Sequence, residues 1–97
     1  MADLLTAGAV REELSRLPDW SGDPTGIGRT IQLGSFPAAI AVVDRVATVA
    51  EELDHHPDID IRWRTLTFRC VTHSAGGVTH LDFELAGRID DIVRSAA

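Results

Sequence analysis

The sequence predicts an α+β fold, a two-layer sandwich in which three helices cover one face of a four-stranded antiparallel sheet. Three segments repeat apolar residues at helical spacing, and two pairs of short strand-like segments lie between them, in the order α-β-β-α-β-β-α. Gly, Pro and Asp cluster between the members of the first pair, as a hairpin turn requires. At 97 residues and 44% hydrophobic composition, the chain is expected to form one domain over residues 1–97.

The N-terminal third predicts one helix and one hairpin. Apolar residues at helical spacing indicate a helix over residues 6–17, with Thr6 as its N-cap and Pro18 as its stop. Residues 20–28 are rich in turn formers and favour a hairpin. The second hairpin strand, over residues 26–34, has one mostly apolar face made of Ile27, Arg29, Ile31 and Leu33.

The second helix has the clearest signals in the chain. Ser35 is its expected N-cap, and Pro37 lies in its first turn, where proline is tolerated. The helix must end near Asp54, because Pro57 disfavours helical geometry in the residue before it. Its apolar stripe is predicted to contain Ile40, Val43, Val46, Ala47, Ala50 and Leu53.

The C-terminal half predicts two strands and a last helix. Apolar residues occupy odd positions over residues 59–63 and even positions over 66–70, so a turn or bulge belongs near Arg64. Thr79 and Asp82 fit a capping box that begins the last helix. Its apolar stripe is predicted to contain Leu81, Leu85, Ile89, Ile92 and Val93.

Composition disfavours several classes of protein. The net charge of -6 opposes binding to nucleic acid, whose affinity for proteins comes mainly from Lys and Arg. The longest uncharged apolar run, residues 36–43, is far too short for a bilayer, and the N-terminus lacks a signal-peptide pattern, so a cytoplasmic protein without membrane contact is expected. Cys70, the one cysteine, allows no intrachain disulfide and is expected to pack in the core.

Three of the four histidines form the most informative cluster of titratable residues. His55 and His56 follow the second helix, and His73 follows the last strand, beside a Ser-Ala-Gly-Gly loop. Histidine exchanges protons near neutral pH. An elimination that expels hydroxide from one atom and a proton from its neighbour needs a general acid and a general base. If the fold brings His73 beside the helix exit, the three histidines can frame a small-ligand pocket.

Each of these residues also has a purely structural interpretation. His55 and His56 can cap the last carbonyls of the helix and interact with its dipole. In this interpretation Asp82 is simply a residue of the capping box, Glu51 is a solvated helix residue, and Trp63 belongs to the core. A zinc site is disfavoured, because it needs three or four convergent ligands. His80 lies in the first turn of the last helix and is given no role.

The order and spacing of these residues resemble the pterin-4a-carbinolamine dehydratase family, also called 4a-hydroxytetrahydrobiopterin dehydratase. The family pattern is matched at every interval by Glu51, His55-His56-Pro57, Trp63, His73 and Asp82. The resemblance covers residues 14 to 92 approximately. Further similar segments are Leu17-Pro18-Asp19-Trp20, Leu53-Asp54, Thr72-His73, Gly76-Gly77 and Leu85-Ala86.

This resemblance implies the same α+β sandwich and a lyase activity. The implied reaction dehydrates 4a-hydroxytetrahydropterin to quinonoid dihydropterin, the step that recycles tetrahydrobiopterin after aromatic amino-acid hydroxylation. It implies a small-molecule pterin substrate and neither a metal nor an organic cofactor. A homo-oligomer, most simply a dimer joined through helices or sheet edges, is also implied, and exposed strand edges offer a physical route to it.

The resemblance also assigns roles to individual residues. His55 and His73 are the implied acid and base, in an order that the sequence leaves open, and His56 binds or orients the pterin. Asp82 supports the site by hydrogen bonding, with a histidine as one candidate partner. The residues implied to bind or border the substrate are Glu51, Asp54, Trp63, Val71, Thr72 and Asp82.

The chain departs from the family pattern at a few positions. Ile59 stands where an aromatic residue often helps to form an arch over the pterin, and Ser74 stands where an acidic residue is common. Cys70 and Val71 also replace more usual residues. An alternative function is a noncatalytic binding module on the same scaffold, since some similar proteins are a dimerisation cofactor of a transcription factor or an assembly factor of a carbon-fixing enzyme.

Overall fold

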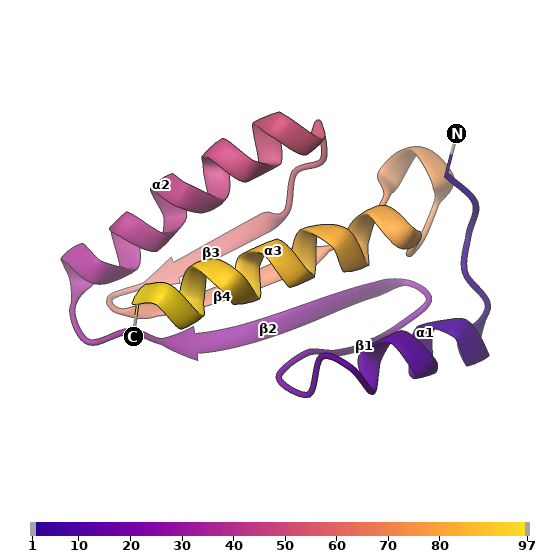
Figure 1. The fold of residues 1–97 in the computed structure, drawn as a ribbon, viewed down its shortest axis with the longest axis horizontal. Coiled ribbons are helices and arrows are strands. Elements are labelled where there is room, and N and C mark those ends of the chain that lie inside the picture. The colour runs from indigo at the N-terminus through magenta and orange to yellow at the C-terminus, as the bar shows by residue number, and fades with distance from the viewer. Residues whose placement is uncertain (1, 97) are drawn as a thin grey trace.

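A computed structural model describes residues 2–96 and confirms the predicted fold class and element order. The elements form one layer of strands and one layer of helices (Figure 1). Their bounds are α1 Ala7–Leu14, β1 Ser21–Asp23, β2 Gly26–Gln32, α2 Phe36–Leu53, β3 Asp58–Arg62, β4 Thr65–Cys70, the short 3-10 helix η1 His73–Ala75, and α3 His80–Ala96.

The sheet is antiparallel, with the strand order β1-β2-β4-β3. The turn between β3 and β4 allows the odd apolar positions of β3 and the even ones of β4 to share a face, as expected. Ile59 pairs with Phe68, and Ile61 pairs with Leu66. Against this face α2 and α3 pack side by side, each running along the strands (Figure 1).

The buried face of α2 differs from the predicted stripe. Only Val46 and Ala50 of the predicted set are fully buried, whereas Ile40 and Val43 are half-buried and Ala47 is exposed. Apolar residues occur almost all round this helix, so more than one stripe fits helical periodicity. Packing against α3 and the sheet selects the face made of Ala39, Val42, Val46, Val49 and Ala50.

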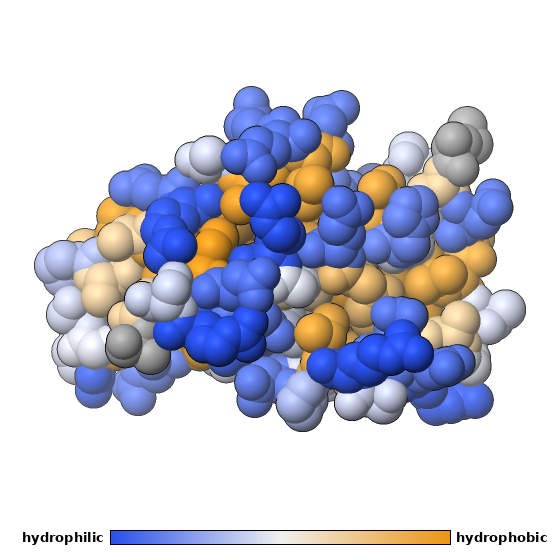
Figure 2. Space-filling view, in the orientation of Figure 1, coloured by the Kyte–Doolittle hydropathy of each residue, from blue (hydrophilic) through white to orange (hydrophobic). Residues whose placement is uncertain are grey.

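The outer surface of the helix layer is largely hydrophilic, and hydrophobic surface shows between α2 and α3 (Figure 2). Within residues 2–96, no helix has both the length and the hydropathy that crossing a bilayer requires.

The predicted caps begin the first two helices. Oγ1 of Thr6 accepts a hydrogen bond from the backbone N–H of Ala9, and Oγ of Ser35 accepts one from that of Ala38, each at 3.1 Å. The first helix ends at Leu14, three residues earlier than predicted, and residues 15–17 continue as hydrogen-bonded turns.

The end of α2 sets the direction of the histidine pair. Asp54 has a left-handed backbone conformation with φ 49°. The N–H of His55 donates to the carbonyl of Ala50 at 3.0 Å, and the N–H of Asp54 donates to that of Glu51 at 3.3 Å. These two bonds form a Schellman motif, which satisfies carbonyls that the helix leaves free. The backbone therefore caps this helix without the imidazole rings.

Cys70, the one cysteine of the chain, is buried in the core, as the sequence predicts. Burial, reinforced by the charges of Asp82 and Asp58, raises the pKa of the Cys70 thiol from 9.0 to about 12. All nine basic residues are arginines and tyrosine is absent, so no other side chain has its ordinary pKa between 9 and 12. Alkaline titration of this protein in that range is therefore dominated by one buried thiol.

This thiol makes the folded state sensitive to alkali. The unfolded thiol ionises above pH 9 while the folded one stays protonated, so stability is complete below pH 9 and declines as pH rises toward 12. The expected slope is at most about 1.4 kcal/mol per pH unit. Urea unfolding of the wild type and of Cys70→Ala between pH 8 and pH 11 measures it. Equal slopes in the two proteins would contradict this account.

Candidate active site

The centre of the site is a contact between His55 and Asp82. His55 leaves the end of α2, and Asp82 lies in the first turn of α3. Nε2 of His55 is 2.6 Å from Oδ1 of Asp82. The His55 side chain is only 10% exposed and the Asp82 side chain is 0% exposed. Two residues far apart in the sequence thus meet in a largely buried pair.

Two threonines complete the environment of the Asp82 carboxylate. Its Oδ2 accepts a hydrogen bond from the backbone N–H of Thr79 and one from the hydroxyl of Thr72, both at 2.9 Å. The hydroxyls of Thr72 and Thr79 are 2.7 Å apart. Because the proton of Thr72 goes to Asp82, Thr79 donates in this second contact. The carboxylate therefore receives three donors, which satisfies a buried polar group.

These contacts orient the His55 ring. An ionised carboxylate only accepts, so the N–H at Nε2 donates to Asp82. The second ring nitrogen, Nδ1, is then the atom of His55 left to exchange a proton with a ligand. A buried carboxylate behind an imidazole holds it in one tautomer and one orientation, as it does in the Ser-His-Asp triad of hydrolases. The expected hydrogen bond from a histidine to Asp82 is confirmed, and Asp82 keeps its capping bond as well.

His56 faces a different partner. Its Nε2 lies 2.5 Å from Oε2 of Glu51, and both side chains are exposed. Glu51 belongs to the last turn of α2, and Asp54 is exposed at the turn that follows. The hydrogen bonds of both imidazoles thus go to carboxylates, so the interpretation of these side chains as carbonyl caps is wrong.

His73 joins the site through its neighbour in the chain. It begins η1 and is exposed, and it directly follows Thr72, the buried residue that shares Asp82 with His55. Thr72 also forms an isolated β-bridge with Gly77, which closes the loop around His73. Val71 is half-buried between Cys70 and Thr72. The fold therefore brings the β4 exit to the α2 exit, as the hypothesis of a shared pocket requires.

Trp63 lies away from this cluster within one chain. It occupies the β3–β4 turn, while His56 precedes the other end of β3. Five strand residues at about 3.3 Å each separate the two by roughly 16 Å. The ring is 68% exposed, with the Arg64 guanidinium carbon 4.7 Å from its centroid. The interpretation of Trp63 as a core residue is therefore wrong, and one chain does not place it beside the histidines.

Sequence reasoning missed the part that Thr79 plays. The capping box identified Thr79 as the first residue of the motif, but its hydroxyl also donates to Thr72. That contact crosses from the loop before α3 to the end of β4, so no local spacing rule could reveal it. The presence of a second threonine at Thr72 was the only available signal.

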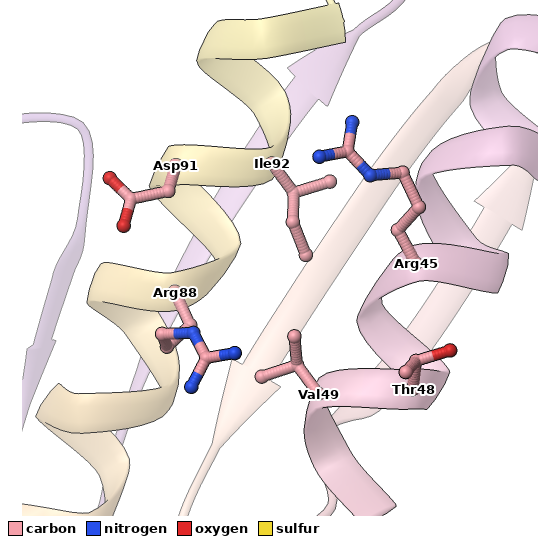
Figure 3. Close-up of a pocket in the computed structure, with 6 residues that line it drawn as sticks. All are labelled: Arg45, Thr48, Val49, Arg88, Asp91 and Ile92. Carbon is pink, nitrogen blue, oxygen red and sulfur yellow. The ribbon is translucent and has the colours of Figure 1, made fainter. Parts of the chain in front are cut away.

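A hollow of the helix layer is separate from this network. A cavity of about 350 Å³ lies between α2 and α3, lined by Arg45, Thr48, Val49, Arg88, Asp91 and Ile92. Val49 and Ile92 form its apolar floor, and both guanidinium groups reach over it, while Asp91 points away (Figure 3). Arg45 donates to Ser95, and Arg88 pairs with Glu52. Its arginines are thus already paired within the chain.

Among residues 2–96, no three His, Cys, Asp or Glu side chains converge closely enough to hold a metal ion.

The chain is similar in sequence to proteins of one known family. The family model described as "Pterin 4 alpha carbinolamine dehydratase" matches residues 3–92. A protein of Nocardia farcinica (strain IFM 10152), provisionally named a pterin-4-alpha-carbinolamine dehydratase, is 55% identical over 92 residues, covering 95% of this chain and 97% of that protein. The chain belongs to the pterin-4a-carbinolamine dehydratase family.

Solved structures agree with this membership. The crystal structure of a transcriptional coactivator/pterin dehydratase from Brucella melitensis is similar with a TM-score of 0.89 and 30% identity, covering 93% of this chain and 98% of that chain. A pterin dehydratase-like protein identified as a RuBisCO assembly factor in the alpha-carboxysome has a TM-score of 0.62 at 22% identity, covering 75% and 84%. This second likeness shows the fold alone.

The Asp82 network predicts a specific loss of stability. Asp82→Asn keeps the shape of the side chain but replaces one acceptor oxygen with a donor that faces His55 or the Thr72 and Thr79 donors. Leaving buried groups unpaired costs about 1–3 kcal/mol. Urea unfolding at pH 7 measures this loss. Asp91→Asn, at an exposed position of the same helix, is the matched control and should change stability by less than about 0.5 kcal/mol. Equal losses of stability in the two variants would contradict the role of the Asp82 hydrogen bonds.

Proposed function

We propose that this protein is a 4a-hydroxytetrahydropterin dehydratase, a hydro-lyase that forms quinonoid dihydropterin and water. The observation that carries the proposal is the His55 ring, held by the buried Asp82 beside the loop that bears His73. Membership of the dehydratase family supports the reaction type. The physiological setting that we propose is cytoplasmic tetrahydrobiopterin recycling, with 4a-hydroxytetrahydrobiopterin as the substrate.

In this mechanism two histidines divide the proton transfers. One protonates the hydroxyl at C4a, so that the C–O bond breaks with loss of water. The other removes the proton from the neighbouring ring atom, whose electron pair forms the new double bond. We assign these two roles to His55 and His73 as a pair. An imidazole suits both tasks, because histidine can give and take protons near neutral pH.

The remaining residues of the cluster would bind and orient the pterin. His56, paired with Glu51, presents a polar edge at the mouth of the site. Asp54 lies beside it, and Val71 and Thr72 would border the substrate on the side of β4. Asp82 acts through His55 and Thr72 as a positioning residue. The proposed chemistry uses these side chains without a metal or an organic cofactor.

Replacing either assigned histidine tests the mechanism. His55→Ala and His73→Ala should each lower turnover of synthetic 4a-hydroxytetrahydrobiopterin by about two to four powers of ten, the usual scale for a general acid or base. His80→Ala, which removes an exposed histidine outside the cluster, is the matched control and should keep wild-type activity. Circular dichroism and thermal unfolding verify that the variants fold.

Two outcomes would count against this function. Full activity of both His55→Ala and His73→Ala would contradict the assignment of these two histidines as general acid and base. If the wild type does not dehydrate several 4a-hydroxypterins, and a pull-down from its native cell recovers one stoichiometric partner, the noncatalytic assembly module is favoured instead.

We also propose that the protein is a homodimer. β3 is an edge strand, because it pairs with β4 alone in the sheet order. An unpaired edge offers backbone donors and acceptors to another strand. Size-exclusion chromatography with light scattering should give twice the mass of the 10.5 kDa chain. A monomer at every concentration tested would refute this proposal.

A further inference from the structure

The loop that carries His73 is held from outside by a turn that is remote in the sequence. Within the loop, the N–H of Thr72 donates to the carbonyl of Gly77 at 3.0 Å, and the N–H of Gly77 donates to the carbonyl of Thr72 at 3.3 Å. Outside it, the N–H of Val78 donates to the carbonyl of Pro24 at 2.9 Å. The β1–β2 turn, which contains Pro24, therefore anchors the end of the His73 loop.

Gly77 is the residue that permits this close approach. It is buried, and a Cβ built on its backbone would lie 2.7 Å from the carbonyl oxygen of Pro24 and 3.0 Å from Cδ2 of Leu4. Ordinary van der Waals contact of a Cβ begins near 3.4 Å. Glycine has no Cβ and so lets two backbone segments come this close. A larger residue at position 77 would push the His73 loop away from the turn.

The β1–β2 turn is itself held in one conformation. The carboxylate of Asp23 accepts hydrogen bonds from the hydroxyl and from the backbone N–H of Thr25, the second at 2.7 Å. This is a local turn that aspartate favours, and the two bonds hold the pKa of the Asp23 carboxyl below its usual 3.8. Arg69 Nη2 donates to the carbonyl of Thr25 at 3.1 Å. The carbonyl of Pro24, between these two residues, is therefore a fixed contact for the loop.

The same backbone segment is linked to the other histidine of the proposed mechanism. Two residues after Gly77, the N–H of Thr79 donates to the carboxylate of Asp82 at 2.9 Å. That carboxylate orients the His55 ring. A displacement at Gly77 would therefore move His73 relative to His55.

We propose that Gly77 is a positioning residue, whose contact with the Pro24 carbonyl holds His73 in the place relative to His55 that the two proton transfers require. The inference rests on the proposed function for the identity of the proton-transfer groups. A general acid or base must lie within hydrogen-bond reach of the reacting atoms. A misplacement of about 1 Å can cost about a hundredfold in rate.

An alanine substitution tests this role. Gly77→Ala should lower kcat by about tenfold to a hundredfold and change KM by less than about threefold, because it displaces a proton-transfer group and leaves the pterin contacts in place. Gly87→Ala is the matched control, because a Cβ there meets no heavy atom within 4 Å, and it should keep the wild-type kcat. Wild-type kcat in Gly77→Ala, or a loss that comes from KM alone, would overturn the proposal.

A double variant separates the backbone contact from the side-chain contact. The Leu4 side chain is flexible and 57% exposed, so it can move aside, whereas the Pro24 carbonyl cannot. Leu4→Ala should therefore keep the wild-type kcat and should not restore the activity of Gly77→Ala. Recovery of wild-type kcat in the double variant would overturn the role of Pro24.

A change in the turn tests the same contact with Gly77 in place. Asp23→Ala, at an exposed position, removes both hydrogen bonds of Thr25 and should lower kcat with KM unchanged, by a smaller factor than Gly77→Ala. It should also speed hydrogen exchange of the Val78 amide, because the bond to Pro24 opens more often. Asp44→Ala, which removes an exposed carboxylate of α2, is the control and should alter neither quantity. Wild-type kcat and exchange in Asp23→Ala would contradict the anchoring of the loop by the turn.

Amide hydrogen exchange also separates this inference from the proposed function. The Val78 amide should exchange at least about tenfold faster in Gly77→Ala than in Gly87→Ala, a comparison that needs no substrate. If the wild type has no dehydratase activity but exchange follows this pattern, the proposed function fails and the anchoring of the His73 loop stands. If the wild type is active but Gly77→Ala matches Gly87→Ala in both exchange and kcat, the positioning role of Gly77 is wrong and the proposed function stands.

Discussion

The carboxylate of Asp82 is the contact on which the arrangement of the site depends. It caps the first turn of α3 through Thr79, holds the end of β4 through Thr72 and orients His55 at the end of α2. Because the side chain is fully buried, each donor that it loses leaves an unpaired polar group without access to water. One residue therefore ties the stability of three chain segments to the orientation of the histidine that we assign to proton transfer.

The adjacent side chains of His55 and His56 contact different partners, because the backbone turns between the helix and the strand. Asp54 takes a left-handed conformation that glycine usually supplies, and aspartate tolerates it better than most residues. The turn directs His55 inward to Asp82 and leaves His56 with Glu51 at the surface. The site thus contains one rigid, buried imidazole and one solvent-facing imidazole, which suits a reaction in which a substrate is held while protons move.

The strand β3 separates residues that the family spacing treats as one pattern. Its extended geometry carries Trp63 away from His56, although only six residues intervene between them. A single chain therefore explains the histidines and Asp82 but leaves the aromatic residue without a function.

Local rules were enough for much of this protein. The Thr6 and Ser35 caps, the hairpins, the turn near Arg64 and the capping box of Asp82 depend on residues a few positions apart, so the sequence by itself determined them. The buried face of α2, the link from His55 to Asp82, the hydroxyl contact between Thr72 and Thr79, and the isolation of Trp63 were decided only by the tertiary structure. These features join segments that are distant in sequence, and periodicity carries no information about which of several compatible faces or partners packing will select.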